Sequence, residues 1–102
     1  MANKTVLITG CSTGIGRLAA KTFHEKGWNV IATMRNPENE GEFKAQSNFR
    51  VARLDVTDKE SIRAAVDEGL ARFGSLDVVV NNAARGGRAL LEVASDEMVR
   101  AM

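Results

Sequence analysis

The sequence contains no tyrosine, one proline and one cysteine among its 102 residues. A single cysteine, Cys11, excludes a disulfide within the chain and is typical of a reducing compartment. The apolar runs are only a few residues long, far short of the roughly 20 residues of a membrane-spanning helix, and the first of them lacks the length of a signal-peptide core. The formal charge of +1 gives no electrostatic case for binding nucleic acid. We therefore expect a cytoplasmic protein that binds neither membranes nor nucleic acid.

The most informative segment is a glycine-rich stretch that joins an apolar run to a helical pattern. Residues 9–16 read TGCSTGIG and follow the apolar run Val6-Leu7-Ile8. A strand, a glycine-rich turn and a helix N-terminus present backbone N–H groups and a partial positive charge to a phosphate. Glycine is needed where φ is positive and where no Cβ fits beside the ligand or the neighbouring strand. The segment therefore predicts a nucleotide-binding turn. The expected contact residues are Gly10, Ser12, Thr13, Gly14, Ile15 and Gly16.

Four apolar segments alternate with helical patterns along the chain. We expect strands at residues 5–9, 29–34, 49–55 and 76–81. We expect helices at residues 14–26, after an Asn36 N-cap, between Thr57 and Gly74, and from Ser95 onward. Strands that are apolar on both faces and alternate with helices indicate an α/β fold, a Rossmann-type parallel sheet with helices on both faces and strand order 3-2-1-4. We therefore expect residues 1–102 to form one partial dinucleotide-binding domain, truncated after about four strands.

Local signals within these helices make further predictions. Thr57 and Glu60 have the spacing of a capping box. His24, beside two charged residues, is expected on the solvated side of the first helix. The first helix is predicted from a recurrence at helical spacing, i, i+3, i+4, i+7 and i+8, of Ile15, Leu18, Ala19, Thr22 and Phe23.

The chain resembles the N-terminal part of the short-chain dehydrogenase/reductase family in three motifs. The family's glycine motif T-G-x-x-x-G-x-G is reproduced by residues 9–16, and its N-N-A-G motif is met by residues 81–84, with alanine in the last position. The family's aspartate at the end of the third strand is met by Asp55, followed by Val56. The resemblance implies that Asp55 accepts a hydrogen bond from adenine with the Val56 backbone alongside, and that the backbone of Asn82 and Ala83 passes close to the ribose.

The resemblance also implies an oxidoreductase that transfers hydride between a nicotinamide cofactor and a carbonyl or alcohol. The family's catalytic serine, and the tyrosine and lysine spaced Y-x-x-x-K, have no counterpart in this sequence. The chain would therefore supply the cofactor-binding half, with no catalytic residue and no proton donor of its own. An alternative is a non-catalytic dinucleotide-binding or self-associating fragment. The edge of the strand that contains Val78, Val79 and Val80 would pair with a second copy to form a homo-oligomer.

The end of the second strand predicts which dinucleotide binds. An acid at this point would accept a bond from the ribose 2′-OH of NAD, but the sequence has Met34 followed by Arg35. A guanidinium is suited to a 2′-phosphate. NADP is the expected cofactor, with NAD as the alternative, and Arg17 is a second candidate cation.

Overall fold

The computed structural model describes residues 3–12, 14–43 and 46–82. The elements are β1 (Thr5–Ile8), α1 (Gly14–Glu25), β2 (Asn29–Met34), the 3-10 turn η1 (Pro37–Asn39), β3 (Phe49–Arg53), α2 (Lys59–Phe73) and β4 (Val78–Val80). The helix predicted from Ser95 lies outside the described residues.

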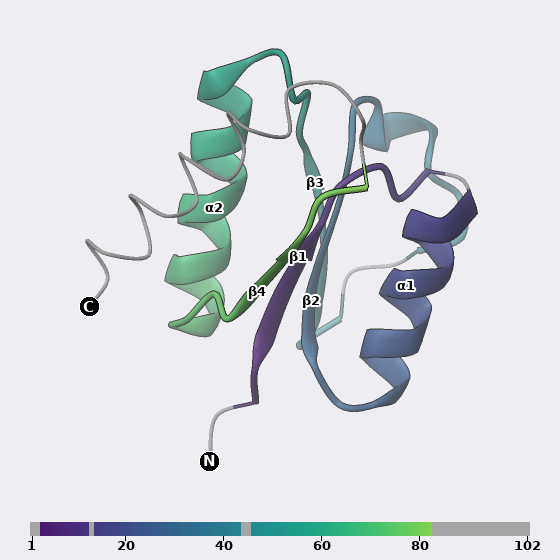
Figure 1. Ribbon diagram of the computed structural model, residues 1–102, viewed down its shortest axis with the longest axis vertical. Helices are drawn as coiled ribbons and strands as arrows, with labels where there is room; N and C mark the ends of the chain where they lie inside the picture. The colour runs from purple at the N-terminus through teal and green to yellow at the C-terminus, as the bar shows by residue number, and fades with distance from the viewer. Residues whose placement is uncertain (1–2, 13, 44–45, 83–102) are drawn as a thin grey trace.

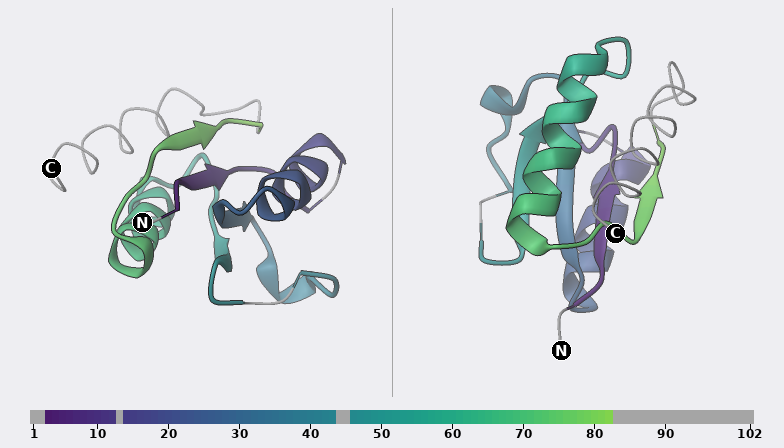
Figure 2. Two further views of the ribbon diagram at one scale, coloured as in Figure 1. Left: turned by 90° about the horizontal axis from the view of Figure 1, so that it is seen from below. Right: turned by 90° about the vertical axis from the view of Figure 1, so that its left-hand side faces the viewer.

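The four strands form one parallel sheet in the order β3-β2-β1-β4, as predicted. Leu7 in the middle of β1 lies opposite Ile31 of β2 and Val79 of β4. The two helices cover opposite faces of this sheet, with α1 on one side and α2 on the other (Figures 1 and 2). This is the Rossmann-type arrangement that the sequence predicted, and it brings the carboxyl ends of all four strands to one edge.

Three of the four strands are shorter in the structure than predicted. The predicted strand at residues 29–34 matches β2 at both ends. The fourth strand shows the reason for the shortening. The Asp77 carboxylate accepts a hydrogen bond from the Thr5 N–H at 2.8 Å, while the Asp77 N–H donates to the Thr5 carbonyl at 2.9 Å. The Thr5 N–H thus donates to the Asp77 side chain instead of to a backbone carbonyl. The regular strand therefore begins only at Val78.

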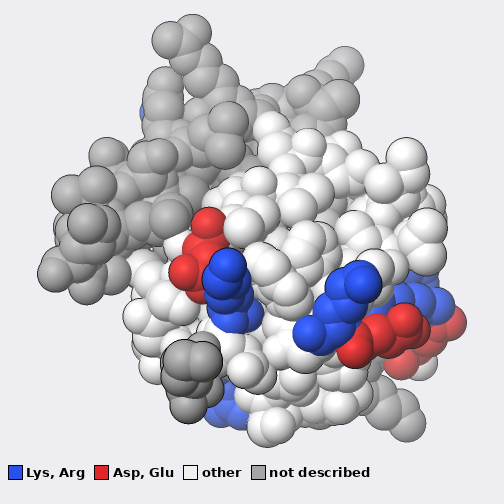
Figure 3. All heavy atoms as spheres, turned by 60° about the horizontal axis from the view of Figure 1, so that its bottom comes forward, with Lys and Arg blue, Asp and Glu red and all other residues white. Residues whose placement is uncertain are grey.

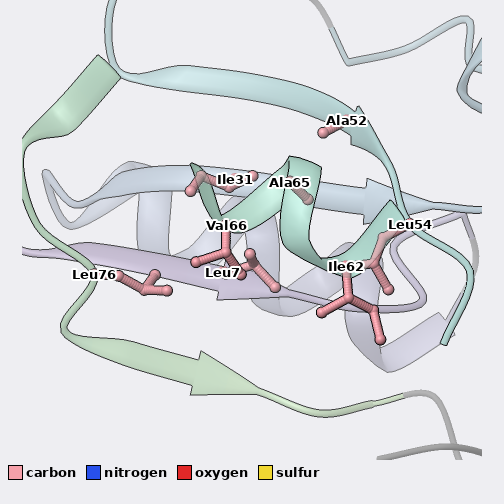
Figure 4. Packing of buried hydrophobic residues seen from close by; sticks show 8 residues of the cluster. All are labelled: Leu7, Ile31, Ala52, Leu54, Ile62, Ala65, Val66 and Leu76. Atoms are coloured by element: carbon pink, nitrogen blue, oxygen red, sulfur yellow. The ribbon is translucent and has the colours of Figure 1, made fainter. Parts of the chain in front are cut away.

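The core on the α2 side is built from alternate strand residues and one face of the helix. Ile62, Ala65 and Val66 of α2 point at the sheet, where they meet Leu7 and Ile31 (Figure 4). All five are almost completely buried. The neighbouring residues of β1 face the other way, so the central strands are apolar on both faces, as a sheet between two helical layers requires.

On the opposite face, α1 buries a different set of residues from the recurrence that predicts it. Gly16 and Ala20 are its buried residues and Phe23 packs beside them, whereas Ile15 is 77% exposed and Leu18 65% exposed. Small residues face β1 because the helix starts directly against the glycine turn. The recurrence therefore predicted the helix correctly, but Ile15 and Leu18 do not lie on its buried face.

The start of α2 also differs from the prediction. Asp58 is the N-cap, and its side chain accepts a hydrogen bond from the Glu60 N–H. Thr57 lies one residue earlier, where its N–H and hydroxyl both donate to the Asp55 carboxylate. The predicted capping box is wrong, because the aspartate after the threonine occupies the capping position. Gly74 ends the helix as its left-handed C-cap, as predicted.

Two smaller predictions have different outcomes. Asn36 is the N-cap and Pro37 opens a short helix, as predicted, but Asn36 makes no side-chain capping bond and the helix is only the 3-10 turn η1. The prediction that His24 lies on the solvated side of α1 is wrong. His24 is half-buried, with its Nε2 3.2 Å from the Asn48 side-chain oxygen and its ring edge against Phe49. It faces the start of β3 rather than solvent, because the chain entering that strand crosses α1 at this point.

The described helices include none that is long and apolar enough to cross a bilayer. Among the described residues on the face drawn in Figure 3, acidic and basic side chains are interspersed and form no patch of one sign.

Candidate functional site

The glycine turn between β1 and α1 has the backbone geometry that its sequence predicts. Gly10 has φ of 68° and Gly14 has φ of 63°, in the left-handed region that favours glycine. Gly16 has a different role, because a Cβ there would lie 2.8 Å from the Asn82 side-chain nitrogen and would overlap the Gly10 carbonyl oxygen. The turn therefore needs glycine for conformation at two positions and for space at the third.

Buried hydrogen bonds hold the turn to β2. The Cys11 N–H donates to the Thr33 carbonyl at 3.0 Å, and the Thr33 hydroxyl donates to the Ile8 carbonyl at 2.8 Å. The Cys11 thiol is buried 3.2 Å from the same Ile8 carbonyl. Burial raises the pKa of this thiol to about 12. Cys11 is thus a protonated core residue beneath the turn and no nucleophile.

The end of β4 forms the other support of the turn. The Asn82 N–H donates to the Thr9 hydroxyl at 2.9 Å, and the Asn82 side-chain amide donates to the Gly10 carbonyl at 3.3 Å. Asn81 places its side-chain oxygen 3.5 Å from the same hydroxyl. The two asparagines therefore join strand ends that are more than 70 residues apart in the sequence.

A cavity of about 420 Å³ opens at this edge of the sheet and brings most of the predicted site residues together. Its walls contain the predicted Gly10, Ser12, Arg35, Asp55, Val56 and Asn82. They also contain Thr9, Met34, Leu54 and Thr57, which the sequence analysis did not propose as contacts. All four directly precede or follow a predicted contact in the sequence, which is the signal that identifies them.

The other predicted contacts lie beside the cavity or outside the described residues. Gly14, Ile15 and Gly16 form the first turn of α1 and do not line the cavity. Thr13 and Ala83 are outside the described residues. The start of α1 has no acidic residue in its first turn, which leaves its partial positive charge uncompensated there.

Asp55 is already held in place by its own loop. One carboxylate oxygen, Oδ1, accepts hydrogen bonds from the Thr57 hydroxyl at 2.6 Å and the Thr57 N–H at 2.9 Å. These two bonds are the main reason why the pKa of Asp55 is lowered, with smaller contributions from the charges of Arg35 and Arg53. Asp55 is thus a carboxylate of fixed orientation at the wall of the cavity.

Arg17, the second candidate cation, does not line the cavity. Its guanidinium is paired with Glu40 at 2.8 Å and with Glu42 at 3.1 Å. Arg35 is therefore the one arginine in the cavity wall formed by described residues.

A second cavity, of about 290 Å³, lies between α1 and the start of β3 and contains none of the predicted site residues. Within residues 3–12, 14–43 and 46–82, no three histidine, cysteine or acidic side chains are grouped as a metal site requires.

The sequence of the chain matches the family described as short chain dehydrogenase over residues 4–102. The chain belongs to the short-chain dehydrogenase family. Members of this family bind a nicotinamide dinucleotide.

Individual relatives agree with this assignment. A 3-ketodihydrosphingosine reductase of Bacteroides thetaiotaomicron is 38% identical over 100 residues, which are 97% of this chain and 35% of the relative. An NADPH-dependent 1-acyldihydroxyacetone phosphate reductase of Schizosaccharomyces pombe is 42% identical over 85 residues, 80% of this chain and 28% of the relative. The crystal structure of a short-chain dehydrogenase from Streptomyces avermitilis superposes with a TM-score of 0.70 and 32% identity, covering 98% of this chain and 43% of that one. This short-chain dehydrogenase chain spans about a third of the length of the curated relatives it matches.

Proposed function

We propose that this chain binds a nicotinamide dinucleotide across the carboxyl ends of β1, β2 and β3. The diphosphate would lie on the glycine turn and the start of α1, and the adenosine would lie toward Arg35 and Asp55. The observation that carries this proposal is the single cavity that joins Gly10 and Ser12 to Arg35 and Asp55. Its volume of about 420 Å³ lies within the usual range of ligand pockets.

We further propose that NADP is preferred over NAD. Arg35 is exposed at the cavity wall, and the residue before it, Met34, offers no acceptor for a ribose 2′-OH. A guanidinium there would bind a 2′-phosphate through charge-assisted hydrogen bonds. Since Arg17 is occupied by acidic partners, the preference would depend on Arg35.

The whole-protein activity that we propose is that of an oxidoreductase acting on a carbonyl or an alcohol. When bound, the nicotinamide supplies or accepts the hydride, and the protein positions it. The residues of this chain would hold the adenine and diphosphate half, and we assign none of them a catalytic role. A cytoplasmic location is also our proposal, supported by the single cysteine, which excludes a disulfide within these 102 residues.

The test is to titrate the chain with NADP and NAD in parallel, before and after Arg35→Gln. Losing hydrogen bonds to a charged phosphate should weaken NADP binding by about tenfold or more and leave NAD binding nearly unchanged. Arg72→Gln is the matched control, because Arg72 is an exposed arginine in the last turn of α2, far from the cavity. Equal loss for both dinucleotides in Arg35→Gln would contradict the role of Arg35 in reading the 2′-phosphate.

The exposed edge of β4 supports a second candidate function, self-association. In the sheet that the described residues form, β4 pairs only with β1, and Val78 is 37% exposed. Such an edge pairs readily with another strand, and we propose a homodimer through β4. Sedimentation should show a dimer that Val78→Lys weakens, and a monomer at high concentration for the unmodified chain would refute the proposal.

A further inference from the structure

The side chain of Arg17 connects the glycine turn to the chain between β2 and β3. Its Nη1 and Nη2 donate to the two oxygens of Glu40 at 2.8 and 2.9 Å, in the bidentate geometry of the strongest ion pairs. Its Nε donates to Glu42 at 3.2 Å, and its guanidinium carbon lies 4.3 Å from the centre of the Phe43 ring. The planar group is therefore held along its edge and over its face.

Glu40 is equally well fixed. Its Oε2 also accepts hydrogen bonds from the N–H groups of Glu42 and Phe43, at 2.7 and 2.6 Å. The side chain of Glu40 is only 6% exposed and that of Arg17 is 21% exposed. The hydrogen bond from Arg17 is the main reason why the pKa of Glu40 falls to about 2. The Arg17–Glu40 pair thus stays ionised. Its geometry is fixed by the contacts of Arg17 with Glu42 and Phe43 and by the backbone N–H groups that donate to Glu40.

The same guanidinium reaches the glycine turn. Nη1 lies 3.4 Å from the carbonyl oxygens of both Cys11 and Ser12. In a trans peptide the carbonyl and the following N–H point in opposite directions. A Cys11 carbonyl turned toward Arg17 therefore directs the Ser12 N–H away from the guanidinium, and Ser12 is part of the cavity wall.

We propose that the Arg17–Glu40 pair is a clamp that sets the peptide orientation of the glycine turn and so positions the Ser12 N–H for a phosphate of the dinucleotide. This inference rests on the proposed dinucleotide function. Arg17 is then a positioning residue that acts through the turn, and it contributes no direct contact with the ligand. Its charge is compensated by Glu40 and Glu42, so it does not compete with Arg35 for the 2′-phosphate.

The test is a double-mutant cycle of Arg17→Gln, Glu40→Gln and the double variant, with Arg17→Lys as the conservative change. Dissociation constants for NADP and NAD are measured by calorimetry. The loss of one N–H bond to a charged phosphate should weaken both dinucleotides about equally, by about tenfold. The double variant should be no weaker than either single variant. Lysine keeps the positive charge but cannot make the bidentate hydrogen bonds of the guanidinium. Arg17→Lys should therefore not restore the affinity for either dinucleotide.

Arg50 and Glu68 provide a matched control, because this half-buried ion pair of 3.1 Å joins β3 to α2 away from the cavity. Arg50→Gln with Glu68→Gln should lower the unfolding midpoint without changing either dissociation constant. If Glu40→Gln instead strengthens the binding of NADP but not of NAD, Arg17 is a direct ligand of the 2′-phosphate and the proposed clamp is wrong. The proposal would also be overturned if the control variants at Arg50 and Glu68 weakened dinucleotide binding as much as the variants at Arg17 and Glu40.

A second readout needs no ligand and separates the clamp from the proposed function. The NMR order parameter of the Ser12 amide should fall from about 0.85, typical of rigid backbone, toward 0.6 or below in Arg17→Gln. The control pair should leave it unchanged. An unchanged Ser12 amide in Arg17→Gln overturns the clamp even if the dinucleotides bind. Failure of the unmodified chain to bind either dinucleotide overturns the proposed function, and with it the positioning role for a phosphate.

Discussion

Replacing Gly16 by alanine tests the close contact between α1 and the glycine turn. An added Cβ would overlap the Gly10 carbonyl oxygen and lie 2.8 Å from the Asn82 side-chain nitrogen. The first of these atoms belongs to the backbone, which buried bonds of the adjacent Cys11 hold in place. The overlap can therefore be relieved only by moving the start of α1 away from the turn.

The size of the effect follows from two opposing contributions. Alanine in place of glycine favours a helix by at most about 1 kcal/mol. Forcing an extra methyl group into a packed site typically destabilises by about 1–3 kcal/mol, and a backbone obstacle places Gly16 at the upper end of that range. We expect a net loss of about 1–2 kcal/mol, which lowers the unfolding midpoint by roughly 4 °C or more in a domain of this size. Dinucleotide binding should be lost, because the displaced helix start carries the expected diphosphate site.

Two other glycines are controls for this substitution. A Cβ at Gly69, in the middle of α2, would overlap the end of the buried Ile31 side chain and no backbone atom, and a Cβ at Gly41 would meet nothing. Gly69→Ala and Gly41→Ala should both keep dinucleotide binding. The assays are thermal unfolding by circular dichroism and titration with NADP. Full stability and full affinity of Gly16→Ala would refute the argument that glycine is needed here for space.

Three further predictions concern single side chains, two for Cys11 and one for the N-cap of α2. Because burial raises the pKa of Cys11 from 9.0 to about 12, the thiol should resist alkylation in the folded chain and react after unfolding; rapid alkylation at neutral pH would contradict its burial. Between these two pKa values the unfolded chain has lost a proton that the folded chain keeps, so stability should fall by about 1.4 kcal/mol per pH unit above pH 9, and Cys11→Ala should remove this slope in denaturant titrations. In urea denaturation, Asp58→Ala should lower stability by about 1 kcal/mol through the loss of the N-cap of α2, and Thr57→Ala, which leaves that cap in place, should lower stability less.

Strand identity, order and the place of the cavity could be predicted from the sequence, because they depend on patterns that span many residues. The apolar run of each strand and the glycine motif each consist of several residues, so a single substitution would leave the prediction unchanged. Asp55 and Arg35 follow two of these strands, so their meeting at one edge of the sheet follows from the strand order alone.

The wrong predictions have a different origin. The helical spacing of the apolar residues predicts α1 but not its buried face, because the short distance to β1 selects the small residues Gly16 and Ala20 and leaves Ile15 and Leu18 exposed. Glu40 was missed as a partner of Arg17 because 23 residues separate the two in the sequence. Such contacts depend on the path of the chain between β2 and β3 past α1. Local sequence patterns do not predict this path.

A calorimetric titration of the unmodified chain with NADP and with NAD shows whether the cavity binds a dinucleotide at all. We expect one binding site for both, with NADP bound more tightly because of Arg35. Binding of neither dinucleotide at millimolar concentration, by a chain shown to be folded, would contradict the claim that the cavity at the glycine turn is a dinucleotide site.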